Sequence, residues 1–147
     1  MALETDYYLT ADAADDLCTL YEPHPAWGER SREEVIQIIE GSDEVVGLWD
    51  TETDVLVASA RVLSDYHVQA MVYDVIIAES RRGEGLGRQV MNVVADHPEL
   101  QEVTLTLHCR EGLVPFYDQC GYVLHDRDVE MSDGTTFTYR TMRLHRD

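Results

Sequence analysis

The chain has 147 residues, a length that suits one compact domain with one core and is too short for two. Its 29 acidic residues outnumber its 11 basic residues, which leaves a formal net charge of −18. A surface of that sign repels nucleic-acid phosphates and anionic lipids. We therefore predict a single domain over residues 1–147 that binds no nucleic acid and no membrane.

The composition also indicates an environment. All eleven basic residues are arginine, the acids are spread along the chain, and 44% of the residues are hydrophobic, enough for a globular core. Concentrated salt screens repulsion between surface carboxylates, so we predict a halophilic source; the alternative is an acidic field that attracts a cationic substrate. Cys18, Cys109 and Cys120 form no Cys-x-x-Cys pair, and the first ten residues show no signal-peptide pattern. We expect a cytoplasmic protein.

The N-terminal part is predicted to contain one strand and two helices. Residues 6–10 resemble a short strand, and Asp12 to Tyr21 place apolar residues at helical spacing before two prolines end the helix. Ser31 followed by Glu34 is the pattern of a capping box. A second helix should therefore begin there and end near Gly41.

Three strands should follow without an intervening helix. Glu44–Trp49 and Val55–Leu63 flank a turn of acidic residues and threonines, which predicts a hairpin. The next strand, Met71–Ala78, is almost entirely apolar apart from Asp74. Such a strand is expected to be buried on both faces.

The remaining elements alternate between helix and strand. An apolar stripe predicts a helix that begins at Leu86 and ends before Pro98. Further patterns predict a half-buried strand over Glu102–His108, a short helix over Leu113–Cys120, and strands over Tyr122–His125 and Thr135–Leu144. This order describes a mixed α/β (α+β) single domain with antiparallel meanders around one helical crossover.

The segment between the apolar strand and the next helix reads Arg82-Gly83-Glu84-Gly85-Leu86-Gly87-Arg88. Its glycines allow a tight turn and close approach of a ligand, and the first amides of the following helix are unpaired donors at the positive end of the helix dipole. The two flanking arginines add positive charge in an acidic chain. The segment predicts a phosphate site, and the simpler alternative is a glycine turn with exposed arginines.

Two common phosphate loops do not match this segment. A Walker loop needs a lysine, and the chain has none. A dinucleotide-binding Gly-x-Gly-x-x-Gly fingerprint also fails, because counting from Gly83 or Gly85 puts Arg88 or Val90 in the last place. Arg82-x-x-Gly85-x-Gly87 instead resembles the pyrophosphate-binding signature of the GNAT superfamily of acyl-CoA-dependent N-acetyltransferases, Gln/Arg-x-x-Gly-x-Gly/Ala.

A second segment supports the same resemblance. Phe116 to Tyr122, which contains Tyr117 and Gly121, is similar to the family's aromatic-Tyr-x-x-x-Gly-aromatic segment, and a predicted strand separates the two motifs. The resemblance implies a single-domain GNAT-like fold, with a mixed central sheet whose fourth and fifth strands splay apart and with flanking helices. It also implies that acetyl-CoA is the co-substrate.

The resemblance implies a role for individual residues of the donor site. The backbone amides from Gly83 to Arg88 would hold the CoA pyrophosphate, and Arg82 would add charge. The strand backbone at Val75, Ile76 and Ile77 would form hydrogen bonds with the pantetheine arm, as it would with a neighbouring β-strand. The acetyl thioester would then lie between the fourth and fifth strands.

Tyr117 matches the tyrosine that in many members of the family protonates the departing thiolate, a role that suits a weak acid. Its alternative is a core aromatic residue. Two positions depart from the family pattern: Glu84 places a negative side chain in the phosphate loop, and Arg110 stands where many members carry an asparagine. The asparagine-specific contact to the pantetheine is therefore not expected here.

The base that deprotonates the amine does not follow from the resemblance, because family members differ in its position. Asp74 is one candidate, since a carboxylate in an apolar strand is costly unless it is paired; the alternative is a structural ion pair, for instance with Arg61. His108 is a second candidate, with a polar strand cap as its alternative. Glu79 could do the same work through water and is equally explained as a surface acid. Cys109 suggests a cysteine nucleophile, for which a small buried thiol is the simpler explanation.

The acceptor is expected to be a small-molecule amine or a peptide amine, bound near residues 21–31 and 63–68. Trp27, Tyr66 and His67 are candidates to line that side. The histidine spacing predicts no metal, and a homodimer is possible. We predict direct attack of the amine on acetyl-CoA in a ternary complex. The alternative function is a catalytically silent acyl-CoA-binding regulatory module.

Overall fold

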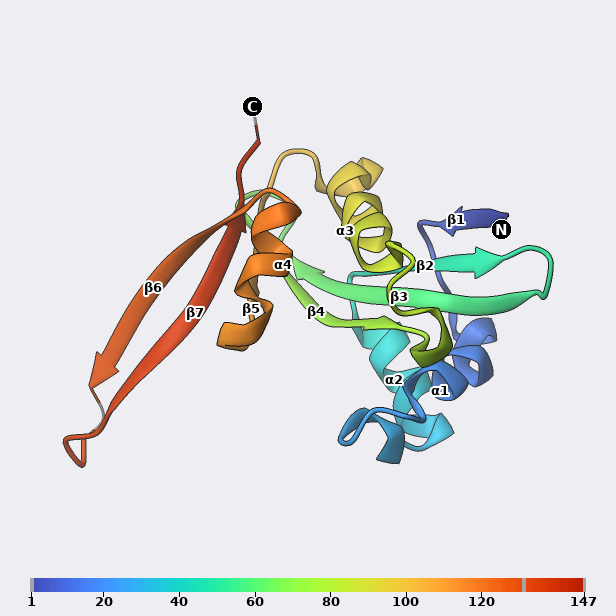
Figure 1. The fold of residues 1–147 in the computed structure, drawn as a ribbon, viewed down its shortest axis with the longest axis horizontal. Helices are drawn as coiled ribbons and strands as arrows, with labels where there is room; N and C mark the ends of the chain where they lie inside the picture. Colours follow the sequence, from blue (N-terminus) through green and yellow to red (C-terminus); the bar gives the residue numbers. More distant parts are fainter. Residues whose placement is uncertain (1, 131, 147) are drawn as a thin grey trace.

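The computed structural model describes residues 2–130 and 132–146 (Figure 1). Its helices are α1 (Ala14–Tyr21), α2 (Arg32–Gly41), α3 (Leu86–Asp96) and α4 (Val114–Gln119). Its strands are β1 (Leu3–Asp6), β2 (Glu44–Asp50), β3 (Val55–Ser64), β4 (Gln69–Ile77), β5 (Thr104–His108), β6 (Tyr122–Glu130) and β7 (Thr136–Leu144). The predicted order of helices and strands is confirmed.

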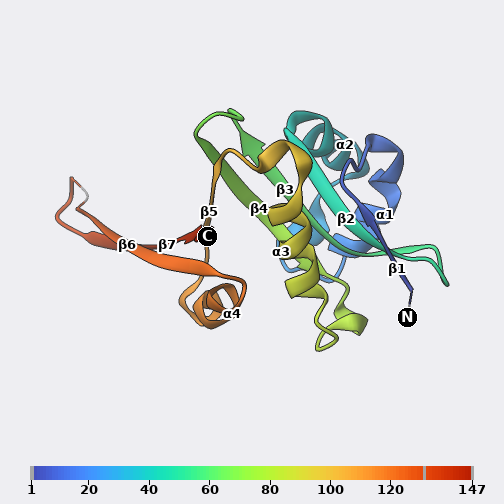
Figure 2. The ribbon, with the colours of Figure 1, turned by 90° about the horizontal axis from the view of Figure 1, so that it is seen from above.

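The strands form one sheet in the order β1-β2-β3-β4-β5-β7-β6. Neighbouring strands are antiparallel except for β4 and β5, which run parallel on either side of the α3 crossover. The β4–β5 pairing covers three residue pairs, from Gln69 with Thr104 to Met71 with Thr106, and the two strands then diverge (Figure 2). The mixed sheet with splayed fourth and fifth strands is therefore confirmed.

Helices cover the sheet from both faces (Figure 1). On one face the apolar stripe of α3 packs into the core through Leu86, Val90, Met91, Val93 and Val94. On the other face α1 and α2 bury Leu17, Leu20, Tyr21, Val35 and Ile39 in a second cluster with Ile76 of β4. The predicted capping box at Ser31 and Glu34 starts α2, with both reciprocal hydrogen bonds present. β4 thus lies between two packed layers.

The first strand differs from its prediction. Strand pairing covers Leu3–Asp6 instead of residues 6–10, because the Asp6 carboxylate accepts a hydrogen bond from the Tyr8 amide and turns the chain. The Leu9 amide still donates to the Val45 carbonyl at 2.9 Å. The segment after Asp6 therefore stays beside β2 without continuing the strand.

β4 carries a bulge at the residue that the sequence singled out. Asp74 and Val75 together lie opposite Ala60 of β3, where the strand register shifts. Asp74 has a φ of 53°, in the left-handed region that aspartate tolerates better than most residues. The bulge turns the Asp74 side chain toward the α1–α2 face, where it meets Arg30. The expected continuous, doubly buried strand is therefore interrupted at Asp74.

The last two strands form a long hairpin that extends away from the rest of the molecule (Figures 1 and 2). β6 and β7 pair from Tyr122 with Leu144 to Glu130 with Thr136, whereas β5 pairs only with residues 141–143 of β7. The first of these strands is longer than the predicted range 122–125. The distal part of the hairpin has no third strand beside it among the residues that the structure describes.

Candidate functional site

The glycine segment forms an open turn between the end of β4 and the start of α3. Gly83 has a φ of 87° and Gly85, the N-cap of α3, has a φ of 80°. A Cβ atom built at either position would meet no atom within 4 Å. No side chain caps the first turn of α3. The start of α3 thus lacks a side-chain cap and has open space beside Gly83 and Gly85, as an anion site at a helix N-terminus requires.

Gly87 has a different function in the same segment. A Cβ atom at this position would lie 2.9 Å from Cζ of Phe116 on α4 and 3.9 Å from Cδ1 of Ile77 at the end of β4. Only a hydrogen fits between the start of α3 and the Phe116 ring. Gly87 therefore allows close contact between the glycine turn and the helix that carries Tyr117.

Charged side chains around the turn divide into two sets. Arg82 and Arg88 are exposed, and neither forms an ion pair with a residue in the described part of the chain. Arg81 instead forms ion pairs with Asp50 and, at 3.8 Å, with Glu84. The Glu84 carboxylate is thus held beside Arg81, while Arg82 and Arg88 remain at the rim of the turn.

Tyr117 lies on α4 with 8% of its surface exposed. Its ring makes edge-on contacts with Phe116, at 4.9 Å between centroids, and with Tyr122, at 6.1 Å. Burial raises the pKa of Tyr117 to about 12, and the neighbouring Cys109 and Cys120 add to the rise. The phenol therefore stays protonated throughout the physiological range, so it can donate a hydrogen bond or a proton.

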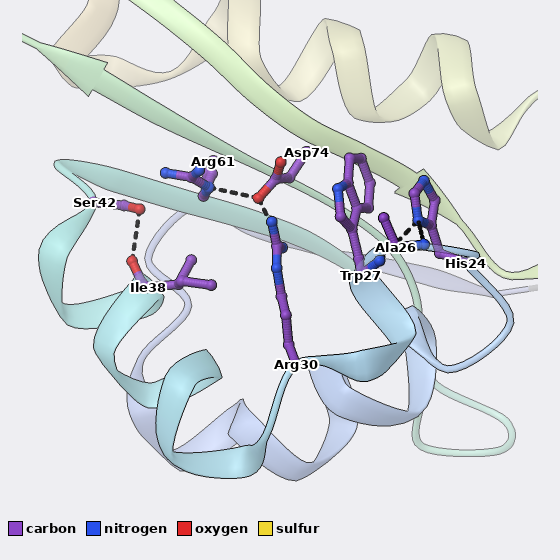
Figure 3. A network of polar contacts seen from close by, with 8 residues as sticks. All are labelled: His24, Ala26, Trp27, Arg30, Ile38, Ser42, Arg61 and Asp74. Carbon is purple, nitrogen blue, oxygen red and sulfur yellow. Dashed lines mark hydrogen bonds and ion pairs between the residues drawn. The ribbon is translucent and has the colours of Figure 1, made fainter.

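Asp74 forms the ion pair that was the alternative to a role as base. Its Oδ2 atom accepts hydrogen bonds from Arg61 Nε at 2.7 Å and from Arg30 Nη1 at 2.9 Å (Figure 3). The sequence suggested Arg61 as a partner. Arg30 was missed, because it lies 44 residues away and no local pattern connects the two positions.

His108 and Cys109 lie at the end of β5, the strand that diverges from β4. The Nδ1 atom of His108 is 3.0 Å from the Thr141 hydroxyl of β7. Burial raises the pKa of the Cys109 thiol, which favours the protonated form and is the opposite of what a thiolate nucleophile needs. Of these two, His108 alone has a side chain suited to proton transfer.

The chain between α1 and α2 forms an aromatic and basic surface below β4 (Figure 3). The His24 ring stacks on Trp27 with 3.9 Å between centroids, and its Nδ1 accepts hydrogen bonds from the amides of Ala26 and Trp27. Burial lowers the pKa of His24, and Arg30 lowers it further. The Nδ1 atom thus acts as an acceptor, and the lowered pKa favours the neutral imidazole with its proton on Nε2. Trp27 was expected on this side; His24 and Arg30 were not.

Tyr66 and His67 do not lie beside this surface. They belong to the turn before β4, whereas the glycine segment follows the other end of that strand. The Tyr66 hydroxyl donates to Glu44 at 2.8 Å, and Glu44 in turn contacts the buried His97 at 3.1 Å. The Tyr66 side chain thus belongs to a polar network of the core, and His67 is exposed. The expectation that residues 63–68 line the acceptor site stays a prediction.

A separate hollow of about 770 Å³ borders β1. Its lining includes Glu4, Asp6, Asp16, Asp54 and the Trp49 ring, and none of the residues predicted for the donor site. In the ranges 2–130 and 132–146 there is no group of three or more histidine, cysteine or acidic residues arranged to hold a metal ion. No helix of those ranges has the length and apolar character to cross a membrane.

Sequence comparisons give a consistent family. The model of the acetyltransferase (GNAT) domain matches residues 14–144. An uncharacterized N-acetyltransferase ycf52-like protein of Prochlorococcus marinus is 28% identical over 104 residues, which cover 69% of this chain and 58% of that protein. An uncharacterized N-acetyltransferase ycf52 of Pyropia yezoensis is 27% identical over 123 residues, 80% of this chain and 71% of that protein.

Solved structures share the fold at lower identity. A spermidine N-acetyltransferase variant from Vibrio cholerae superposes with a TM-score of 0.73 and 20% identity, over 97% of this chain and 92% of that one. An aminoglycoside 6'-N-acetyltransferase in complex with coenzyme A superposes with a TM-score of 0.70 and 15% identity, over 97% and 96%. The family match includes the glycine turn, α4 and both diverging strands, so the chain belongs to the GNAT acetyltransferase family.

Proposed function

We propose that this protein transfers the acetyl group of acetyl-CoA to a primary amine by direct attack in a ternary complex. One observation carries the proposal: β4 and β5 stop pairing after three residue pairs, and β4 then leads into a glycine turn with uncapped helix amides. An extended ligand with an anionic end matches this combination, because it can pair with strand backbone and place its phosphates at the helix.

In the proposed complex the donor lies along β4. Backbone amides from Gly83 through Glu84, Gly85, Leu86 and Gly87 to Arg88 bind the pyrophosphate, and Arg82 adds charge at the rim. The backbone at Val75, Ile76 and Ile77 pairs with the pantetheine amides. These residues pair with no described residue of β5. The coenzyme A complex of the aminoglycoside 6'-N-acetyltransferase supports a CoA donor for this fold.

The reaction requires two proton movements. The amine loses a proton as its nitrogen attacks the thioester carbonyl; the carbon–sulfur bond then breaks and the thiolate takes a proton. Tyr117 suits the second step, because its buried phenol stays protonated. A thiol is a stronger acid than this phenol, so Tyr117 acts first as a hydrogen-bond donor that stabilises the developing thiolate.

Asp74 and His108 remain the proposed proton acceptors for the amine, directly or through water. They lie on the two strands between which the thioester is proposed to sit. Both arginine contacts of Asp74 use the Oδ2 atom, which leaves Oδ1 as the oxygen for an amine or a water molecule. The pH dependence of kcat/KM in a variant of Asp74 and in a variant of His108 distinguishes the two candidates.

Calorimetric titration with acetyl-CoA in molar salt tests the donor site. We expect binding by the native protein and at least a tenfold weaker affinity for Gly85→Val, because a branched side chain strains a φ of 80° and fills the space before α3. Gly41→Ala is the matched control, since its added Cβ meets no atom within 4 Å. Equal affinity of both variants would remove the proposed donor site. Binding without turnover on a broad amine panel would favour the regulatory module.

A further inference from the structure

Two arginines converge on one carboxylate at the proposed acceptor side. Arg30 reaches Asp74 from the loop before α2, and Arg61 reaches it from β3 (Figure 3). One negative charge balances one of the two guanidinium groups, which leaves this cluster with a net positive charge. The chain has a net charge of −18 and only 11 basic residues, so two arginines on one carboxylate are an unusual local concentration of positive charge.

Aromatic rings fix the orientation of both guanidinium groups. Arg30 lies 5.2 Å from the Tyr21 ring centroid and 5.3 Å from that of Trp27, and Arg61 lies 5.0 Å from the Tyr73 centroid. Each arginine side chain is about one-fifth exposed, 20% and 21%. A guanidinium that is held in one orientation loses less entropy when it binds a planar anion in a bidentate way. Arg61 contacts Asp74 through Nε, so its two terminal nitrogens point elsewhere.

The positive charge extends beyond these two residues. The charged groups that act on His24 are Arg30, Arg82 and Arg110, which lower its pKa after burial does, and Asp74, which opposes them. Arg82 follows β4 and Arg110 follows β5. Arg30, Arg82 and Arg110 therefore outnumber Asp74 among the charged groups that act on His24. A polycationic acceptor meets repulsion there, and an anionic group is attracted.

We propose that the acceptor amine also carries a carboxylate, as an amino acid does, and that Arg61 together with Arg30 binds this carboxylate. The amine then lies next to Asp74, because the arginine that binds one end of the acceptor is bonded to that aspartate. This inference rests on the proposed acetyl transfer. An acceptor with a carboxylate would differ from spermidine and from aminoglycosides, the polyamine-type compounds named for two enzymes that share this fold.

Matched acceptor pairs test the inference. Acetyl transfer is measured as thiol release for amino acids and for the amines that remain after their decarboxylation, such as phenylalanine and phenethylamine, with spermidine alongside. We expect kcat/KM to be about 100-fold higher for the carboxylated member, mostly through KM. Equal or better use of phenethylamine or spermidine would overturn the inference and leave the acetyl transfer in place. No transfer to any acceptor would instead count against the proposed function.

Substitution of Arg61 localises the effect. Arg61→Gln should lower the kcat/KM of the amino acid relative to that of the decarboxylated amine about 100-fold. The variant is scored by this ratio, because Arg61 also contacts Asp74 and its loss changes the rate for both acceptors. Arg61→Lys should recover part of the loss, because it restores the charge but not the bidentate geometry. Arg32→Gln is the control: this arginine pairs with Asp15 on the surface at 2.6 Å and lies outside the cluster. An unchanged preference in Arg61→Gln would contradict the assignment.

A binding measurement keeps the inference independent of turnover and of stability. N-acetylphenylalanine and N-acetylphenethylamine, the two expected products, are titrated into the CoA-bound native protein and into the Arg61 variants. Native protein should bind the carboxylated product at least tenfold more tightly, and Arg61→Gln should lose this difference. Thermal unfolding and acetyl-CoA affinity of each variant show that the fold and donor site are intact. Equal binding of the two products by native protein would overturn the inference.

Discussion

Tyr117 shows how burial changes the acid strength of a single side chain. Its ring packs between Phe116 and Tyr122, and this environment raises the pKa of Tyr117 to about 12. A phenol of that acidity is a poor source of free protons and a permanent hydrogen-bond donor. The proposed contribution to catalysis is therefore stabilisation of the leaving thiolate as its charge develops.

We predict that Tyr117→Phe lowers kcat about 100-fold with little change in KM for acetyl-CoA. Because the pKa of Tyr117 is about 12, the native rate should not fall as the pH rises through about pH 10. Steady-state kinetics across pH measures both effects. Tyr8→Phe is the control, since Tyr8 is 55% exposed and lies on the β1 side. A rate that is unchanged in Tyr117→Phe would return this residue to a core role.

The sequence singles out some residues of the candidate site and misses others for a physical reason. The glycine turn is a local pattern, and both left-handed glycines, Gly83 and Gly85, fall where the motif predicts a turn. Asp74 stood out because a carboxylate in an apolar strand needs a partner. Its second partner, Arg30, follows from tertiary packing of the α1–α2 loop below β4, and no spacing within the chain encodes that contact.

At the level of elements, Gly87 connects the donor turn to α4. A Cβ atom at this position would lie only 2.9 Å from Cζ of the Phe116 ring. A side chain there requires either the Phe116 ring or the start of α3 to move. Gly87 therefore lies at the contact between the helix amides of α3 and the helix that carries Tyr117.

We predict that Gly87→Ala destabilises the fold by about 1–3 kcal/mol and also weakens acetyl-CoA binding, because overpacking displaces α3 from α4. Phe116→Leu in the same chain should relieve the clash and recover part of both losses. Chemical denaturation and calorimetry measure the two effects. Gly112→Ala serves as the control, since no atom lies within 4 Å of its added Cβ. Additive effects of Gly87→Ala and Phe116→Leu would show that the two positions are not coupled.

The turn between β3 and β4 provides a second test at this scale. The Asp65 carboxylate accepts hydrogen bonds from the amides of His67, Val68 and Gln69 at 2.9–3.1 Å. These bonds lower the pKa of Asp65 to about 2, with Val68 contributing most. A lowered pKa in the folded state means that the stabilisation is present above about pH 4 and is lost as the pH falls toward 2.

Asp65→Asn should therefore lower the melting temperature at neutral pH, and the difference from the native protein should shrink as the pH falls from about 4 to 2. Thermal unfolding at a series of pH values measures this difference. Glu102→Gln, an exposed position outside any turn of this kind, should show no such convergence. A constant difference down to pH 2 would show that the charge of Asp65 does not stabilise the turn.

Elements with strong local signals were predicted well, and those set by pairing partners were not. The α2 capping box and the β2–β3 hairpin depend on nearby residues, and both are present. β1 is displaced because the Asp6 side chain turns the chain. The bulge at Asp74 and the length of β6 depend on the neighbouring strand in the sheet. The spacing of apolar residues along the sequence does not identify that neighbour.

At the scale of the whole molecule, the acidic surface predicts a dependence on salt. The net charge is −18, and several arginines are already engaged in ion pairs within the described residues. The Debye length falls from about 10 Å at 0.1 M salt to about 3 Å at 1 M, so repulsion between exposed carboxylates weakens steeply over that range. The halophilic source and cytoplasmic location remain predictions.

We predict that the melting temperature rises continuously from about 0.1 M to about 3 M KCl. Calorimetry over this range measures the rise, and a matched series in sucrose controls for solute exclusion from the surface. The far-ultraviolet circular dichroism signal should decline first in the lowest salt. A melting temperature that is independent of KCl would contradict adaptation to salt and favour an acidic field directed at a ligand.

The short ladder between β4 and β5 has a consequence for how the two halves of the molecule stay together. Three residue pairs, Gln69–Met71 with Thr104–Thr106, join the main chains of the β1–β4 half and the β5–β7 half. This seam is where backbone amides should exchange with solvent first in the empty protein. The donor proposed to bind along β4 would supply the missing strand from outside the chain. Donor binding and stability would then be linked, because a ligand that binds only the folded protein raises the free energy of unfolding as its concentration increases.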